Sequence, residues 1–207
     1  MCIRDRGYRV WLAPFMANGK PLHVQGFLPA FERTARRTAK GLQALAGFDI
    51  PLVGLDPAMT LVYRQEYRKI AGLECPDVLL PQEWLLKALD GQPKLPAKSV
   101  AFRLLGHCTE KTNAAPSAAM WVKVFEQAGL QVAAEATGCC GMSGTYGHEA
   151  RNLETSRTIF AQSWEPALDS GAAAEPLATG YSCRSQVARL KNATLRHPIQ
   201  VLLEHLQ

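Results

Sequence analysis

The stretch Ala136-Thr-Gly-Cys-Cys-Gly-Met-Ser-Gly-Thr-Tyr-Gly147 places two adjacent cysteines inside a run of glycines. The glycines recur at every third position: Gly138, Gly141, Gly144 and Gly147. Because glycine has no Cβ, the backbone can take positive φ there and can approach a bound group closely. The pattern therefore predicts a loop that forms a binding site and whose chemistry is that of sulfur.

Two neighbouring thiols favour a metal centre over a disulfide. Adjacent cysteines rarely pair with each other, because the small ring that results strains the peptide bond between them. A polynuclear cluster can accept both thiolates, one on each metal, so Cys139 and Cys140 indicate an iron–sulfur or similar centre. The simpler interpretation is two buried cysteines in a tight turn, since free cysteine is among the most buried residue types.

Outward from this loop, three cysteine-bearing segments each follow a short apolar stretch that is predicted as a strand. These strands are Val100–Leu105 before Cys108, Leu130–Ala136 before Cys139 and Cys140, and Pro176–Thr179 before Cys183. Loops at the carboxyl ends of parallel strands meet at one edge of a sheet, so we expect the four cysteines to share a site. Four thiolates can hold an iron–sulfur cluster or a zinc ion.

The remainder of the chain alternates between helical and strand-like patterns. Strands are also predicted at Tyr8–Pro14 and Ile50–Leu55, with a turn or helix from Asp56 to Tyr67. Helices are predicted over Phe27–Ala46, Pro81–Leu89, Pro116–Ala128, 147–168 and from His197 to the end. Such alternation predicts an α/β fold with mostly parallel sheets and with the cysteine loops at the carboxyl edge of the strands.

A weak internal repeat predicts two related halves. With a shift of 125 residues (176 − 51), Pro51-Leu52 aligns with Pro176-Leu177, and Ala58 then aligns with Cys183. Gly91–Lys98, which contains two prolines, is the predicted linker. We therefore divide the chain into a degenerate first half-repeat (7–92) and a second half-repeat with the cysteine site (93–207). Residues 1–6 are interpreted as a non-native leader, and Cys2 is disregarded with them.

Composition excludes several classes of function. The chain has 207 residues, 47% hydrophobic and 20% charged, with a formal net charge of +5, as in ordinary globular proteins. The basic residues Arg33, Arg36, Arg37 and Lys40 follow helical spacing and predict a solvated helix face, not a nucleic-acid surface. No apolar run is long enough to cross a membrane. Six cysteines without a secretory signal indicate a reducing compartment, the cytoplasm. Homo-oligomerisation is left open.

The order Cys108, Cys139-Cys140-Gly141 and Cys183 resembles the CCG, or cysteine-rich, domain of heterodisulfide reductase subunits and of related iron–sulfur subunits. The family pattern ends in Cys-x-x-Cys, and here the first cysteine of that pair is replaced by Gly180. The resemblance implies an iron–sulfur cluster of the 4Fe-4S type. From their own positions, Gly138, Gly141 and Gly144 of the loop and Arg184 next to Cys183 are the candidates that line the cofactor site. Arg184 could stabilise an anionic cluster or a substrate carboxylate, and an ordinary surface arginine is an equally good interpretation of it.

A closer resemblance covers nearly all of the chain after Arg6. Asn18–Pro21, Val53–Asp56, Arg64–Tyr67, 138–151 and Ala178–Gln186 are similar to the C-terminal region of bacterial FAD-linked oxidases of the D-2-hydroxyglutarate dehydrogenase type. The resemblance implies electron transfer from a flavin, with the FAD domain and a ferredoxin-like iron–sulfur domain on other parts of a longer chain. It also implies that this fragment alone is inactive.

Two rival functions remain open at this stage. Without the first cysteine of Cys-x-x-Cys, the region could be a structural zinc or domain-docking module with no redox role. Cys139 and Cys140 could instead act as a thiol–disulfide pair, although neither belongs to a Cys-x-x-Cys motif. His107 and His148 flank the site and could be ligands or proton carriers. Because four cysteines already suffice as ligands, we interpret each histidine as supporting the ligands or a turn. Cys75 lies outside the pattern and is interpreted as a packed thiol.

Overall fold

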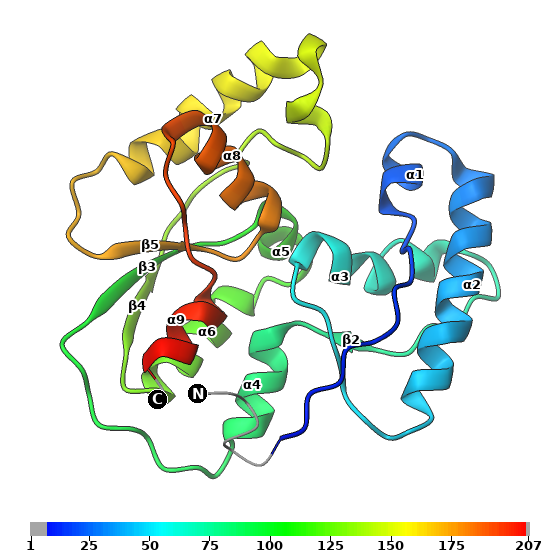
Figure 1. The fold of residues 1–207 in the computed structure, drawn as a ribbon, viewed down its shortest axis with the longest axis horizontal. Helices are drawn as coiled ribbons and strands as arrows, with labels where there is room; N and C mark the ends of the chain where they lie inside the picture. The colour runs from blue at the N-terminus through cyan, green and yellow to red at the C-terminus, as the bar shows by residue number, and fades with distance from the viewer. Residues whose placement is uncertain (1–7, 206–207) are drawn as a thin grey trace. The chain divides into compact units, whose positions relative to one another are not determined.

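The computed structural model describes residues 8–205 of the chain, and the predicted leader with Cys2 lies outside them. The chain divides between Trp84 and Leu85 into two compact units, a boundary that falls within one helix, α4 (Pro81–Leu89). The architecture is mixed α/β, with one short parallel sheet in each unit (Figure 1). In residues 8–205 no helix is both long and apolar enough to cross a membrane.

Helices dominate the first unit. Its elements are α1 (Lys20–Val24), α2 (Leu28–Ala46), β1 (Leu52–Val53), α3 (Pro57–Arg64), η2 (Tyr67–Lys69) and β2 (Val78–Leu79). One face of α2 is buried, with Phe31, Ala35 and Ala39 packed against Val62 and Tyr67. The basic residues lie on the exposed face, as the periodicity predicts: Arg33, Arg36, Arg37 and Lys40.

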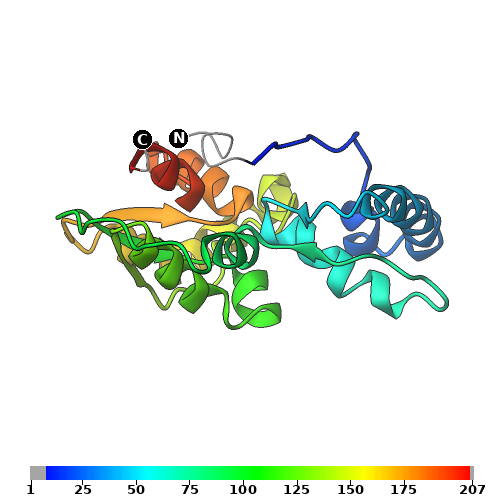
Figure 2. The ribbon, with the colours of Figure 1, turned by 90° about the horizontal axis from the view of Figure 1, so that it is seen from below.

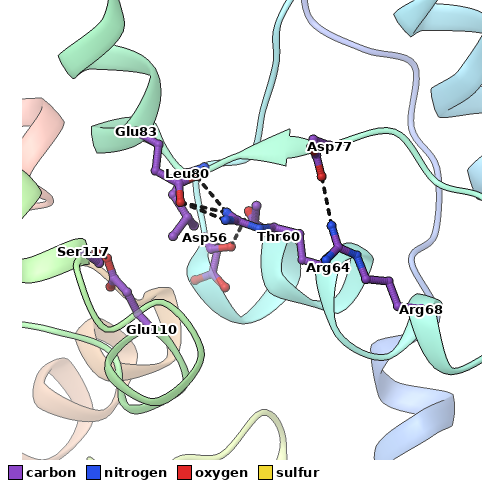
Figure 3. Close-up of polar contacts among 9 residues, drawn as sticks. All are labelled: Asp56, Thr60, Arg64, Arg68, Asp77, Leu80, Glu83, Glu110 and Ser117. Carbon is purple, nitrogen blue, oxygen red and sulfur yellow. Dashed lines mark hydrogen bonds and ion pairs between the residues drawn. The ribbon is translucent and has the colours of Figure 1, made fainter.

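Local polar contacts fix where the elements of this unit begin (Figure 3). The Asp56 carboxylate accepts a hydrogen bond from the Met59 N–H at 3.1 Å and caps α3, as expected of an N-cap aspartate. Arg64, at the end of α3, donates two parallel hydrogen bonds to Glu83 at 2.7 and 2.9 Å. Glu83 also accepts from the Leu80 N–H at 2.7 Å, which ties the start of α4 to α3.

The predicted strand Tyr8–Pro14 is wrong. Residues 8–19 contain neither helix nor strand, and Figure 2 shows them as a blue trace. The side chains of Leu12 and Phe15 are 94% and 95% exposed. The described sheet of this unit is the two-residue pair β1–β2, and the segment pairs with neither strand. A strand-like sequence needs the backbone of a partner, and its apolar pattern alone cannot supply one.

The second unit is built on a three-stranded parallel sheet in the order β4-β3-β5. Its strands are β3 (Ala101–Leu105), β4 (Gln131–Ala134) and β5 (Glu175–Ala178). Its helices after α4 are α5 (Cys108–Asn113), α6 (Ser117–Gln127), α7 (Leu153–Leu168), α8 (Tyr181–Lys191) and α9 (Pro198–His205), with short 3₁₀ helices η3 (Tyr146–His148) and η4 (Ala150–Asn152).

The central strand β3 is buried from Phe102 to Leu105 and separates two apolar clusters. Phe102 and Leu104 pack with residues of α6 and α9, whereas Leu105 packs with residues of α7 and α8. This division follows from the alternation of side chains along a strand, and it places helices on both faces of the sheet (Figure 1). The α/β prediction is therefore confirmed at the level of mixed helices and short parallel sheets.

The segment predicted as a linker, Gly91–Lys98, is bound to the second unit. Its Leu95 and Lys98 N–H groups donate to the carbonyls of Gln127 and Gly129 at 3.1 and 2.8 Å. A Cβ on Gly129 would lie 2.1 Å from the Pro96 carbonyl oxygen, so the contact needs glycine there. The two prolines thus mark an irregular segment packed on the end of α6.

The predicted half-repeat aligns similar elements. The 125-residue shift places β1 on the last two residues of β5, and places α3 within α8. Each pair is a parallel strand followed directly by a helix. The repeat stays a prediction, since this succession of elements is common in α/β proteins.

Candidate metal centre

The three strands of the second unit place the cysteines at one edge of the sheet. Cys108 follows the end of β3 by three residues, while Cys139 and Cys183 follow the ends of β4 and β5 by five residues each. Because the strands are parallel, these segments leave the sheet on the same side. The segments are less loop-like than predicted, since Cys108 begins α5 and Cys183 is the third residue of α8.

The four thiols contact one another in a row. Cys108 is hydrogen-bonded to Cys139, Cys139 to its neighbour Cys140, and Cys140 to Cys183. Cys140 and Cys183 are buried, with exposed fractions of 2% and 1%, whereas Cys108 and Cys139 are half-buried. The structure therefore brings together all four cysteines that the sequence singles out.

Hydrogen bonds between these thiols shift their pKa values in opposite directions. The pKa of Cys139 is lowered, chiefly because the Cys108 and Cys140 thiols donate hydrogen bonds to it. The Gly141 N–H also donates to the Cys139 Sγ at 3.3 Å. The pKa of Cys108 is raised by its bond to Cys139 and by burial, and the pKa of Cys140 by its bonds to Cys139 and Cys183. The arrangement favours one thiolate, at Cys139, held by protonated neighbours.

The donor set fits a thiolate-bound centre by its chemistry. Four sulfur donors from three separate segments, partly shielded from water, are what iron–sulfur clusters and structural zinc sites use. Within residues 8–205, no group of three or more His, Cys, Asp or Glu side chains is already arranged to hold a metal ion. A bound centre would have to replace the contacts that the thiols make with one another.

The glycines of the loop that holds Cys139 and Cys140 have different roles. Gly141 has φ +82°, and a Cβ on it would lie 2.2 Å from the Ser156 carbonyl oxygen in α7. Gly138 donates its N–H to Ser163, also in α7, and its own Cβ would lie 3.2 Å from that hydroxyl. Gly144 has φ +67° with open space around it. Close approach to α7 thus explains Gly138 and Gly141, and a left-handed turn explains Gly144.

The His107 ring lies against Gly180, the position where the resemblance to the cysteine-rich family leads us to expect a cysteine. A Cβ on Gly180 would lie 2.3 Å from Cδ2 of His107 and 3.1 Å from Sγ of Cys183. The ring is fixed there, because Nδ1 accepts from the Thr109 N–H at 3.1 Å and Nε2 is hydrogen-bonded to the Ser182 hydroxyl at 3.3 Å. No side chain larger than glycine fits at position 180 unless this ring moves.

The other candidate residues have structural contacts. Arg184 donates to the Ala178 and Thr179 carbonyls at 2.9 and 3.1 Å, so it binds the end of β5. His148 is exposed in η3. Cys75 lies in the first unit, where burial and the charge of Asp77 raise its pKa to about 11, as expected of a packed thiol.

Sequence reasoning missed two residues of α5 beside the cysteines. Glu110 is 2% exposed and accepts hydrogen bonds from the hydroxyls of Ser117 and Thr179. Glu110 and Ser117 are drawn in Figure 3. Thr179 precedes Cys183 by four residues in the same segment. Lys111 donates to the carbonyl and hydroxyl oxygens of Thr137, which leads to Cys139. The signal was a Glu-Lys pair within one helical turn of Cys108, but the helix was too short and too polar to be recognised.

Comparison with known proteins gives relatives of one enzyme class. The chain is 63% identical to the D-2-hydroxyglutarate dehydrogenase of Pseudomonas putida over 202 aligned residues. The alignment covers 97% of this chain and 20% of that protein. It is 44% identical to the D-2-hydroxyglutarate dehydrogenase of Escherichia coli K12 over 204 aligned residues. That alignment covers 98% of this chain and again 20% of the relative. The chain thus spans about a fifth of the length of these curated relatives, which are oxidoreductases.

A more distant relative is shorter. It is a subunit of the anaerobic glycerol-3-phosphate dehydrogenase of Escherichia coli K12, and it is 24% identical over 195 residues, covering 91% of this chain and 49% of that protein. No family model and no solved structure matches the chain. Both kinds of relative are dehydrogenases or dehydrogenase subunits, and both match nearly the whole chain.

Proposed function

We propose that this chain is the iron–sulfur-binding, electron-transferring region of an FAD-linked dehydrogenase of the D-2-hydroxyglutarate type. The observation that carries the proposal is the meeting of four thiols from three segments at one edge of a parallel sheet. The relatives support it, since a dehydrogenase that is 63% identical and a dehydrogenase subunit that is 24% identical both match this region.

In this proposal the thiolates of Cys108, Cys139, Cys140 and Cys183 hold the cluster. A bound cluster supplies one-electron transfer, which a flavin needs in order to pass on its two electrons singly. The protein contributes burial, which excludes water from Cys140 and Cys183, and the Gly141 N–H, which donates to the Cys139 sulfur. Hydrogen bonds to sulfur and burial are the means by which proteins set a cluster's reduction potential.

The remaining parts of the catalytic system belong to the proposal as well. The resemblance implies that two further parts lie elsewhere on a longer chain. One is the domain whose FAD oxidises the 2-hydroxy acid, and the other is a ferredoxin-like domain. The sequence 8–205 then acts between the flavin and an electron acceptor. The substrate class, D-2-hydroxy acids such as 2-hydroxyglutarate, comes from the relatives alone.

A second candidate function is a structural zinc site without a redox role. The replacement of one expected cysteine by Gly180, with the His107 ring in its place, leaves four thiols at this site. Four thiolates are the number that a closed zinc site takes. Zinc would fix the ends of β3, β4 and β5 relative to one another and would carry no electrons.

Metal analysis and spectroscopy of anaerobically purified protein separate the two candidates. For an iron–sulfur cluster we expect brown protein with several irons per chain, and loss of most visible absorbance in Cys140→Ser and Cys183→Ser. Each variant replaces a thiolate by a hydroxyl, which binds iron poorly. Cys75→Ser is the matched control, because it removes a thiol from the other unit and should leave the iron content unchanged.

Zinc would give about one colourless metal per chain, and the same two variants would then lose fold stability because metal binding is coupled to folding. Metal-free wild-type protein with variants of equal stability would contradict both candidates. Equal iron loss in Cys75→Ser would contradict the assignment of the four ligands.

A further inference from the structure

The geometry of α5 places Lys111 next to the row of cysteines. It follows Cys108 by three residues on α5, so the two side chains project from the same face of the helix. The Lys111 side chain is half-buried, and its Cγ lies 3.5 Å from the position of a Cβ on Gly106, at the end of β3. Its stem therefore runs along the backbone that delivers Cys108, and its ammonium is directed toward the next segment.

The Lys111 ammonium is held at the entrance of the Cys139-Cys140 loop. Nζ donates to the carbonyl oxygen of Thr137 and, at 3.1 Å, to the hydroxyl of the same residue. Thr137 precedes Cys139 by two residues. Two acceptors on one residue restrict the position of a flexible side chain, so its charge stays near the loop.

Lys111 is surrounded by groups that are anionic when ionised. Cys108, Cys183 and Cys139 all favour its charged form, as does Glu110, whereas burial opposes it and lowers its pKa. One side chain is thus electrostatically close to three of the four cysteines, which come from three different segments. A thiolate-bound metal is an anionic centre, because four thiolates carry more charge than Zn²⁺ supplies.

We propose that Lys111 supplies a fixed positive charge to the cysteine site and compensates the negative charge of its thiolates. Lys111 is a positioning and charge-compensating residue, and it makes no bond to the metal. In the context of the proposed function, on which this part of the inference rests, its charge makes reduction of an anionic centre easier. The loss of that charge would shift the reduction potential to a more negative value.

The charge can be measured without any metal, on the reduced 207-residue chain. Iodoacetate and iodoacetamide alkylate the same thiolate, but only iodoacetate is negatively charged. The ratio of their rates at one pH cancels the ionised fraction of the thiol and reports the local potential. Tryptic peptides followed by mass spectrometry give this ratio separately for the half-buried Cys108 and for the peptide that holds Cys139 and Cys140.

For Lys111→Met we expect the iodoacetate-to-iodoacetamide ratio at Cys108 and at the Cys139-Cys140 peptide to fall by about threefold, the effect of one unit charge a few ångströms away in a largely aqueous dielectric. Lys111→Arg keeps the charge and should keep the wild-type ratio. Lys123→Met is the matched control, since it removes an exposed lysine from α6 of the same unit and should leave the ratio unchanged. Circular dichroism of each variant checks that the fold is retained.

An unchanged ratio in Lys111→Met would overturn the proposal, as would an equal fall in Lys111→Arg or in Lys123→Met. An equal fall in the arginine variant would mean that Lys111 acts only by its shape. The alkylation test does not depend on the proposed function. Absence of iron from purified protein would contradict the proposed function, and the iodoacetate-to-iodoacetamide ratio would still decide the role of Lys111.

Discussion

At the scale of single residues, Gly141 shows what the Cys139-Cys140 loop requires. It combines φ +82° with a backbone so close to α7 that a Cβ would lie 2.2 Å from the Ser156 carbonyl oxygen. Ser156 holds the same turn from the other side, because its hydroxyl donates to the Gly141 carbonyl at 2.8 Å. The Gln186 amide in turn donates to the Ser156 hydroxyl at 2.9 Å, so the loop is joined to both α7 and α8.

Gly141→Ala should therefore destabilise the protein by about 2–4 kcal/mol, the sum of a positive-φ penalty and a backbone clash. Gly144→Ala is the matched comparison, because it has φ +67° in the same loop but open space around it. Its cost should be about 1 kcal/mol, the penalty of positive φ alone. Denaturant unfolding followed by circular dichroism measures both values, and equal losses would show that the contact with α7 does not constrain the loop.

Most residues of the candidate site could be predicted from the sequence, because adjacent cysteines and strand ends are local patterns. Cys108, Cys139, Cys140 and Cys183 were all identified in this way, and the structure brings them into contact. Glu110 and Lys111 could not be identified, since their roles depend on Thr179 and Thr137, each more than twenty residues away. Sequence spacing does not show which segments a side chain will reach.

At the scale of elements, the short helix α5 connects the segments around the cysteines. It carries Cys108, and its Glu110 accepts from Ser117 at the start of α6 and from Thr179 just after β5. The Trp121 indole N–H lies 3.4 Å from the same carboxylate. Thr179 also accepts from the His107 N–H at 3.0 Å, so the Cys108 and Cys183 segments share one buried polar network.

Removing the carboxylate should destabilise this network as a whole. Glu110→Ala leaves buried hydroxyl donors without their acceptor, and each such donor costs about 1–3 kcal/mol. We expect a total loss of roughly 3 kcal/mol in the free energy of unfolding, measured by denaturant titration. Glu126→Ala, an exposed glutamate on α6, is the control and should change stability by less than about 0.5 kcal/mol. Similar effects of the two substitutions would contradict the network.

The elements that the sequence predicted well are those with a strong periodic pattern. The predicted helices Phe27–Ala46, Pro81–Leu89 and Pro116–Ala128 agree with α2, α4 and α6 to within one residue at each end. The helices α5 and α8 were missed because they are polar and follow strands directly, where loops were expected. Their helical form depends on tertiary contacts such as those of Glu110 and Gln186, which local propensity does not describe.

At the scale of the whole molecule, the chain corresponds to about a fifth of the dehydrogenases that it resembles. In the proposed function, the flavin that takes the hydride from the 2-hydroxy acid lies on another part of a longer chain. We therefore expect the 207-residue chain, supplied with FAD and D-2-hydroxyglutarate, to reduce no artificial electron-accepting dye above background. A full-length relative assayed beside it is the positive control. FAD-dependent turnover by the chain alone would contradict this division of roles.

The exposed segment before α1 has a practical consequence for anyone who handles this protein. Trp11, Leu12 and Phe15 are 74%, 94% and 95% exposed, on backbone that belongs to no sheet or helix. Exposed bulky apolar side chains on backbone that pairs with no strand are a starting point for strand-to-strand aggregation between molecules. Aggregation should therefore increase steeply with protein concentration. Dilute samples, or substitution of these three side chains by serine, suit the long anaerobic measurements that the cysteine site requires.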